Sequence, residues 1–188
     1  AGGVSAILNE IQLAVSDTNQ TFANSGIVQR IRLVHSAEVN YTETGVLDTD
    51  LDRLQKPADG IIDNAHALRN TYGADAVSLW VQNGDYCGLG FVMNSTAFSF
   101  AGSAFSVVRR DCATSIHAFA HELGHNFGAL HNREDNDITE PLYPYAFGYQ
   151  QRYTTPYFRT VKAYSCAGSV VCPLIPYWSS PIAFYNGQ

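Results

Sequence analysis

The sequence predicts an α/β sheet domain followed by a small irregular subdomain, and three observations carry that prediction. Apolar residues recur at helical spacing in several segments before residue 128. Short apolar runs typical of strands lie between those segments. After residue 131 proline, tyrosine and glycine become dense and regular periodicity disappears. The 188 residues suit a single domain, which we expect to divide into residues 1–130 and 131–188.

The N-terminal half alternates helical and strand-like patterns. Apolar residues at helical spacing over 4–22 indicate an amphipathic helix. From residue 27 the stretch IVQRIRLVHSAEV alternates apolar and polar residues, which predicts a half-buried strand. Two short helices should follow, one stopped at Pro57 and one ending near Gly73.

The middle of the chain is predicted to supply further strands. AVSLWV at 76–81 is typical of a buried strand. NGD at 83–85 is a turn signal, and it predicts a hairpin into a second strand near 86–93. AFSVVRR at 104–110 predicts another short strand directly before the next helix.

A helix over 115–127 carries the densest group of chemically active residues. Thr114 or Ser115 is expected to cap its N-terminus. His121 and His125 are one helical turn apart, so both imidazoles should leave the same face. The expected buried face comprises Ile116, Phe119, Ala120, Leu123 and Phe127.

The stretch HELGHNFGALH at 121–131 predicts a catalytic metal site. Gly128 can adopt a left-handed conformation that ends the helix, so that His131 returns toward His121 and His125. Three neutral imidazoles with an open fourth position describe a catalytic zinc site. Zinc lowers the pKa of its water toward ~7, and the neighbouring Glu122 can take the proton. The alternative, histidines exposed on a polar helix face, is disfavoured by the apolar residues of the same helix.

Four cysteines indicate the redox environment. Cys87, Cys112, Cys166 and Cys172 permit three pairings, and none belongs to a CxxC motif of the kind that binds zinc. Pairing Cys166 with Cys172 would close a short loop and leave Cys87 for Cys112. Two disulfides imply an oxidising compartment, so we expect a secreted protein. The alternative is four buried free thiols.

Composition disfavours other classes of function. The net charge is −6 and no run of Lys or Arg is present, so nucleic acid is not an expected partner. The longest apolar runs are far shorter than a membrane span, so no membrane partner is expected. The first residues, AGGVSAILNEI, are typical of an amphipathic helix, which fits a cytosolic protein or a mature chain whose leader has been removed.

HExxHxxGxxH is the signature of the metzincin zinc endopeptidases, and the chain resembles that family over most of its length. Further segments resemble the secreted bacterial peptidyl-Asp metallopeptidases, a reprolysin-like group: CGLGF, FSVVRRDCA, FAHELGHNFGALH, YPYAFGY, FRTVKAYSC and CPLIPYWSSP. The resemblance implies an α+β metzincin (zincin-like) fold, with a twisted mixed sheet and helices above a cleft. It also implies cleavage of peptide bonds, with a preference for the amino side of Asp.

The resemblance implies functional roles for several residues after the third histidine. Tyr164 matches a turn tyrosine that some metzincins place near the metal, where its hydroxyl could stabilise an oxyanion; packing is the alternative. An acidic substrate side chain needs a positive pocket, and this region holds Arg133, Arg152 and Arg159. We predict that Arg159 or Arg152 binds the substrate carboxylate, against the alternative of solvated surface arginines.

The chain departs from the family in one turn and at its ends. Metzincins place a methionine beneath the metal, whereas this chain has Lys162 there and its only methionine is Met93. Burial and a nearby dication both disfavour an ammonium, so Lys162 should turn outward or lose its proton. Relatives have a strand before the first helix and a helix after PYWSSP. We expect a propeptide or a partner chain to supply these elements.

Two functions from different classes are therefore considered. The first is a monomeric secreted zinc endopeptidase acting on proteins or peptides, with Zn²⁺ bound by His121, His125 and His131 and water activated by Glu122. The second is a catalytically weak zinc-binding protein on the same fold. Lys162 supports the second function, and the retained Glu122 opposes it.

Overall fold

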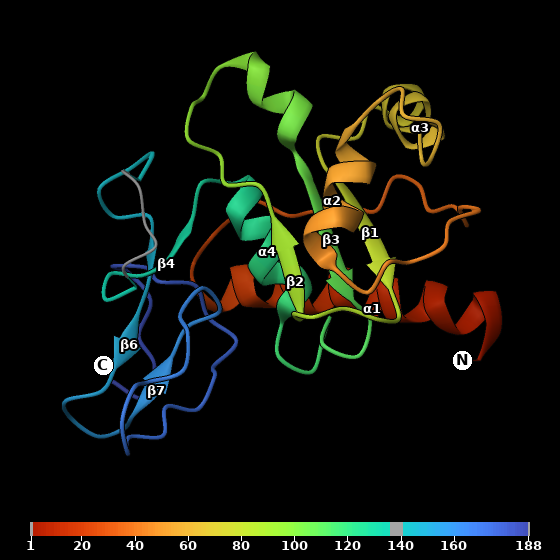
Figure 1. The fold of residues 1–188 in the computed structure, drawn as a ribbon. Helices are drawn as coiled ribbons and strands as arrows, with labels where there is room; N and C mark the ends of the chain where they lie inside the picture. The colour runs from red at the N-terminus through yellow and green to blue at the C-terminus, as the bar shows by residue number, and fades with distance from the viewer. Residues whose placement is uncertain (1, 136–140, 188) are drawn as a thin grey trace.

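The computed structural model describes residues 2–135 and 141–187, and it arranges them in layers around a small sheet (Figure 1). The helices are α1 Gly3–Asn24, α2 Leu47–Gln55, α3 Asn64–Tyr72, the 3-10 helix η1 Phe98–Ser103, and α4 Ala118–Asn126. The strands are β1 Val77–Val81, β2 Gly88–Gly90, β3 Phe105–Arg109, β4 Leu130–Asn132, β5 Phe147–Gly148, β6 Gln150–Gln151 and β7 Phe158–Arg159. This mixture of helices and a mixed sheet is the α+β class that the family resemblance implies, whereas the sequence patterns alone indicated an α/β sheet domain.

The main sheet has the order β1-β3-β2, with β1 parallel and β2 antiparallel to β3. The predicted hairpin is therefore wrong, because β3 lies between the two strands that the turn at 83–85 separates. A central strand must be apolar on both faces, and the side chains from Phe105 to Val108 are all buried. β2 consists of Gly88, Leu89 and Gly90 and suits an edge.

Each face of the sheet packs against its own helices. Leu79, Val81, Phe105 and Val107 join the core that contains the buried leucines of α2. On the opposite face Val108, with Trp80, packs with residues of α1 and α4. The alternation of side chains along a strand produces both cores from one set of strands. In Figure 1, α1 crosses below the sheet, α2 overlaps its strands at the centre of the view, and α3 lies above them.

The strand expected from residue 27 is absent from the structure, and residues 27–43 lie outside any helix or strand. The side chain of Asn19 explains part of this difference. Its amide nitrogen donates to the Ile31 carbonyl at 2.9 Å, and its oxygen accepts from the Ile31 N–H at 2.8 Å. The peptide groups of Ile31 thus find partners on α1 instead of on a neighbouring strand.

Helix α4 begins at Ala118, three residues later than predicted, and the expected cap by Thr114 or Ser115 is wrong. His117 precedes it with a φ of 56°, and its ring pairs with Asp17 of α1. The Ser115 hydroxyl donates to the Asp111 carbonyl, within the preceding turns. The expected buried face is correct in its centre, but Ile116 and Phe127 are 44% and 45% exposed.

The C-terminal residues form a lobe of short elements beside α4 (Figure 1). β4 pairs in parallel with β5, and β6 pairs antiparallel with β7. Trp178 joins this lobe to α1, since its indole N–H donates to the Thr21 hydroxyl at 2.8 Å and its backbone N–H to the Ser25 hydroxyl at 2.7 Å. The division into two subdomains at residue 130 stays a prediction.

The disulfides join Cys87 to Cys112 and Cys166 to Cys172, which is the pairing expected from the sequence. The first bond links the start of β2 to the chain that leads into α4, and the second closes a loop in the C-terminal lobe. Within residues 2–135 and 141–187, no helix is long and apolar enough to cross a membrane.

Candidate metal centre

The three histidines of the motif converge on one point. α4 presents His121 and His125 one turn apart, and Gly128 ends the helix with a φ of 84°. β4 then returns the chain, so that His131 Nε2 lies 3.1 Å from the Nε2 atoms of both other rings. Gly128 also permits a close approach, because a Cβ there would lie 3.2 Å from the Met93 carbonyl.

This geometry fits a divalent metal ion. Zinc–nitrogen bonds of about 2.0–2.1 Å in a tetrahedron place the nitrogens about 3.3 Å apart, close to the separations in the triad. The Nδ1 of His121 lies 2.8 Å from the Val161 carbonyl and donates to it, which leaves Nε2 with a free lone pair. The Nδ1 of His131 pairs with Asp135 Oδ2 at 2.6 Å in the same way. Imidazole nitrogens that converge at this distance can share one bound cation.

The environment keeps the His121 and His125 rings neutral, which is the form that binds metal. Burial lowers the pKa of His121 well below its usual value, and the charges of Lys162 and His125 add to the shift. Burial, with Lys162 and His131, lowers the pKa of His125 to about 2. An imidazole with a low pKa offers its nitrogen lone pair at neutral pH without competition from protons.

Glu122 lies between α4 and the edge strand β2. Glu122 is only 6% exposed. Two glycines of β2, Gly88 and Gly90, leave the space that it occupies. A Cβ on Gly88 would lie 2.5 Å from the Glu122 Cγ, and one on Gly90 would lie 2.8 Å from the Glu122 carbonyl. Burial raises the pKa of Glu122 to about 7, although the charge of Lys162 opposes the shift. The role of these glycines was missed from the sequence; the repeated glycine in CGLGF was the available signal.

Lys162 lies inside the molecule, so of the two expected alternatives the outward turn is wrong and the lowered pKa agrees with loss of the proton. It is 2% exposed, and its Nζ donates to the His121 carbonyl at 2.9 Å. Burial lowers its pKa well below the usual value, against the opposing charge of Glu122. Gly124 explains the position, because a Cβ there would lie 2.8 Å from the Lys162 Cδ and 2.6 Å from the Trp178 ring. The missing Cβ leaves the lysine stem a path beneath the helix.

Comparisons with known proteins agree with this site. A family model described as metallo-peptidase family M12B, reprolysin-like, matches residues 1–170. The chain belongs to this family. Its match covers both the sheet and the histidine triad, so the metzincin-like interpretation of the fold applies to the arrangement in Figure 1.

Three relatives of this reprolysin-like chain share the name peptidyl-Asp metalloendopeptidase. One from Stenotrophomonas maltophilia (strain K279a) is 41% identical over 180 residues, covering 94% of this chain and 41% of the relative. One from Xanthomonas campestris pv. campestris is 40% identical over 177 residues, covering 94% and 40%. One from Pseudomonas fragi is 32% identical over 171 residues, covering 90% and 86%. The chain thus spans about two fifths of the length of the first two relatives.

Tyr164 of this reprolysin-like chain lies beside the triad. Its ring centroid is 4.0 Å from that of His131 and 6.4 Å from that of His121. Two amide side chains hold its backbone: the Tyr164 N–H donates to Asn132 Oδ1 at 3.0 Å, and Gln150 Nε2 donates to its carbonyl at 2.8 Å. The residue is 47% exposed, so a substrate can reach it. The role of its hydroxyl stays a prediction.

The arginines of the C-terminal lobe differ in their partners. Arg152 pairs with Glu134 at 3.3 Å, and Arg133 stacks on the Phe147 ring at 4.1 Å. Arg159 donates to the Ala163 carbonyl at 2.8 Å, and burial lowers its pKa. No ion pair of Arg159 occurs with any acidic residue in the part of the chain that the structure describes.

Proposed function

We propose that this protein is a zinc-dependent endopeptidase. The observation that carries the proposal is the convergence of three imidazole nitrogens, together with the buried Glu122, which directly follows His121 in the helix. Nitrogen ligands in a tetrahedral arrangement suit zinc, and three protein ligands leave one position for water or substrate. Membership of a metallopeptidase family supports peptide hydrolysis.

The residues of the site divide the work of hydrolysis. His121, His125 and His131 would hold the ion, which when bound supplies an activated water and polarises the scissile carbonyl. Glu122, with a pKa of about 7, is suited to accept a proton from the attacking water and to pass it to the leaving amine. Tyr164 offers a hydroxyl beside the triad for the developing oxyanion.

We further propose that the enzyme prefers the amino side of aspartate, as the name of its relatives suggests for those proteins. Arg159 is the better candidate for binding the acidic side chain. It is half-buried, it has no carboxylate partner among the described residues, and its guanidinium contacts the carbonyl that precedes Tyr164. A desolvated guanidinium gains most from a bidentate carboxylate. Arg152 already pairs with Glu134.

Secretion and a protein or peptide substrate complete the proposal. Two disulfides favour an oxidising compartment, and all four cysteines lie in segments that resemble secreted peptidases. The chain acts as a monomer. The first two relatives are longer than this chain, and a propeptide is a candidate for part of the additional sequence.

A second candidate function is a catalytically weak zinc-binding protein. The buried Lys162 favours it, because an amine hydrogen-bonded to the His121 carbonyl replaces the uncharged methionine that metzincins have there. Glu122 argues against it, since a binding protein has no need for a buried carboxyl group beside the ligands.

The two candidates are separated by digestion of a proteome-derived peptide library with mapped cleavage sites. Before digestion, elemental analysis should find one zinc per chain. We expect cuts before Asp that disappear after chelation and return with zinc. Zinc binding without cleavage would refute the endopeptidase and favour the zinc-binding protein. Cleavage without a preference for Asp would refute only the proposed specificity.

A further inference from the structure

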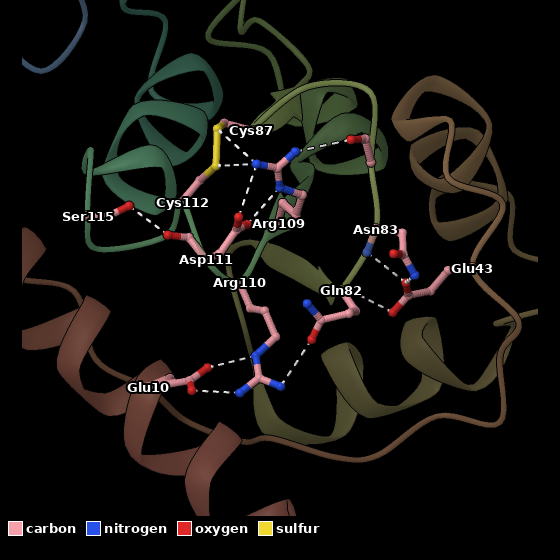
Figure 2. A network of polar contacts seen from close by, with 11 residues as sticks. Glu10, Glu43, Gln82, Asn83, Cys87, Arg109, Arg110, Asp111, Cys112 and Ser115 are labelled. Atoms are coloured by element: carbon pink, nitrogen blue, oxygen red, sulfur yellow. Dashed lines mark hydrogen bonds and ion pairs between the residues drawn. A yellow bond between two sulfur atoms is a disulfide. The ribbon is translucent and has the colours of Figure 1, made fainter. Parts of the chain in front are cut away.

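A polar network surrounds the disulfide between Cys87 and Cys112, and the Arg109 guanidinium lies at its centre (Figure 2). The Nη2 atom of Arg109 lies 3.3 Å from Cys112 Sγ and 4.0 Å from Cys87 Sγ. The Nη1 atom of the same guanidinium donates to the Gly84 carbonyl at 3.2 Å. The cation is thus held against the sulfur atoms, and nearest to that of Cys112.

Asp111 holds the Arg109 guanidinium in place without fully neutralising its positive charge. Its carboxylate accepts from Arg109 Nε at 2.6 Å and from Nη2 at 3.1 Å (Figure 2). The Asp111 side chain is 58% exposed, whereas that of Arg109 is 28% exposed. Water therefore screens the negative charge more than the positive charge, and the sulfur atoms are nearer to the guanidinium. A thiolate formed at Cys112 would therefore lie beside the positive end of this ion pair.

The two sulfur atoms differ in access. Cys87 is half-buried, whereas Cys112 is only 5% exposed. An external thiolate can therefore reach Cys87 Sγ more easily, and the sulfur that leaves is that of Cys112. Exchange is faster when the leaving sulfur is stabilised as a thiolate, which is what the guanidinium at 3.3 Å provides.

We propose that Cys87–Cys112 is a thiol–disulfide exchange site, at which a small thiol attacks Cys87 and expels the Cys112 thiolate toward Arg109. The first step forms a mixed disulfide on Cys87 and breaks the protein disulfide. A second thiolate then attacks the external sulfur, releases the Cys87 thiolate and forms the oxidised disulfide of the small thiol. Two electrons pass from two thiols to the protein, and the released thiolates take protons from water according to their pKa values.

Opening the bond would loosen the surroundings of Glu122. The Cys87 carbonyl accepts the Arg109 N–H at 3.0 Å, and Gly88, the first residue of β2, lies against the Glu122 side chain. On the other side, the Cys112 carbonyl accepts the N–H groups of Ile116 and Ala118 at the start of α4. The disulfide therefore clamps two elements that enclose Glu122, and its reduction leaves only noncovalent contacts between them.

Arg110 provides a matched control. It is the next residue on the chain, but its guanidinium pairs with Glu10 of α1 at 2.6 Å and with Gln82 at 3.3 Å, away from the sulfur atoms (Figure 2). Arg110→Gln removes the same charge from the same segment without changing the neighbour of Cys112. The disulfide Cys166–Cys172 serves as an internal reference within each variant.

The experiment incubates the zinc-loaded protein with reduced glutathione, quenches with acid, alkylates free thiols and maps the cysteines by mass spectrometry. We expect the mixed disulfide on Cys87 and not on Cys112. Opening should slow about fivefold in Arg109→Gln and stay within about twofold in Arg109→Lys and Arg110→Gln. Deuterium uptake over 88–91 should rise after opening.

Two results would overturn the proposal, and neither depends on peptidase activity. The first is a glutathione adduct on Cys112 in the unmodified protein, which is independent of any variant. The second is an equal rate of opening in Arg109→Gln and the unmodified protein while Cys166–Cys172 reacts at the same rate in both.

Discussion

The sheet region and the C-terminal lobe both contribute to the candidate metal centre, but they position their residues in different ways. The sheet region supplies His121, His125 and Glu122 from a single helix that packs on the sheet. The lobe supplies His131 and Tyr164 from short strands and turns. One region relies on helical periodicity, and the other on specific hydrogen bonds between side chains and backbone.

The contacts of the lobe show how irregular chain can be precise. The amide side chains of Asn132 and Gln150 bond both backbone groups of Tyr164, and Thr160 Oγ1 accepts the Tyr149 N–H at 2.8 Å. Asn132 and Gln150 are both buried polar residues. Each buried amide satisfies backbone groups that a sheet would otherwise pair. Loss of one such side chain should therefore disturb the lobe near the bonds that it makes, whereas the position of helix α4 depends on many contacts.

The largest effect is expected from Glu122→Gln, which tests the sheet region's half of the site. The amide keeps the shape but cannot accept the proton, so kcat/KM should fall by about 10³-fold or more. Metal content should stay at one ion per chain, because Glu122 is not one of the three proposed ligands. Glu38→Gln, at an exposed carboxylate, is the control. Peptidase activity near that of the unmodified protein would refute the assigned role.

Gly148→Ala tests how tightly the lobe is packed beneath the site. A Cβ on Gly148 would lie 2.5 Å from both the Ala163 nitrogen and the Lys162 carbonyl carbon, which are backbone atoms. The strand β5 must then move, and we expect the free energy of unfolding to fall by about 3 kcal/mol. Gly102→Ala is the control, since nothing lies within 4 Å of the added atom. Equal denaturation midpoints for the two variants would show that the lobe adapts.

Asp135→Asn addresses His131, the candidate ligand that the lobe contributes. The carboxylate bonds the Nδ1 of His131 at 2.6 Å, so it orients the ring and increases its basicity. Zinc affinity in a chelator competition should fall about tenfold or more. Asp52→Asn, at an exposed residue paired with Lys56, should leave the affinity unchanged. An Asp135→Asn affinity within twofold of the unmodified protein would mean that β4 alone orients His131.

Lys162→Met sharpens the comparison at the point where the two regions meet, and its effect should be the smallest. Removing a buried amine should raise the free energy of unfolding by about 1 kcal/mol near pH 7 and slow zinc loss to a chelator. The His121 carbonyl loses the hydrogen bond from Lys162 Nζ, but it remains part of helix α4. A less stable methionine variant would assign Lys162 a supporting role.

The pH dependence of that difference provides an independent check. The folded-state pKa of Lys162 is lowered, so between this pKa and the unfolded value of about 10.4 the unfolded chain binds a proton that the folded chain does not. Stability of the unmodified protein therefore rises with pH through this window. The advantage of Lys162→Met should shrink as the pH approaches 10. Lys56→Met, at an exposed lysine, should show no such trend.

Local patterns were sufficient for much of the site. The spacing of His121, Glu122 and His125 depends only on helical geometry, and Gly128 indicated the turn that returns His131. The helix over 4–22, the strands at 76–81 and 104–110, and the pairing of the four cysteines were also predicted correctly. These features depend on residues close in sequence, or on a loop short enough to close by itself.

Other features required contacts between distant parts of the chain. The order β1-β3-β2 depends on which strand can be buried on both faces. Within the irregular residues 27–43, Asn19 bonds the peptide groups of Ile31 in place of a neighbouring strand. The burial of Lys162 depends on the space left by Gly124, 38 positions away. Sequence periodicity reports the neighbours along one element. The tertiary structure alone decided which backbone groups and side chains from separate elements compete for the same space.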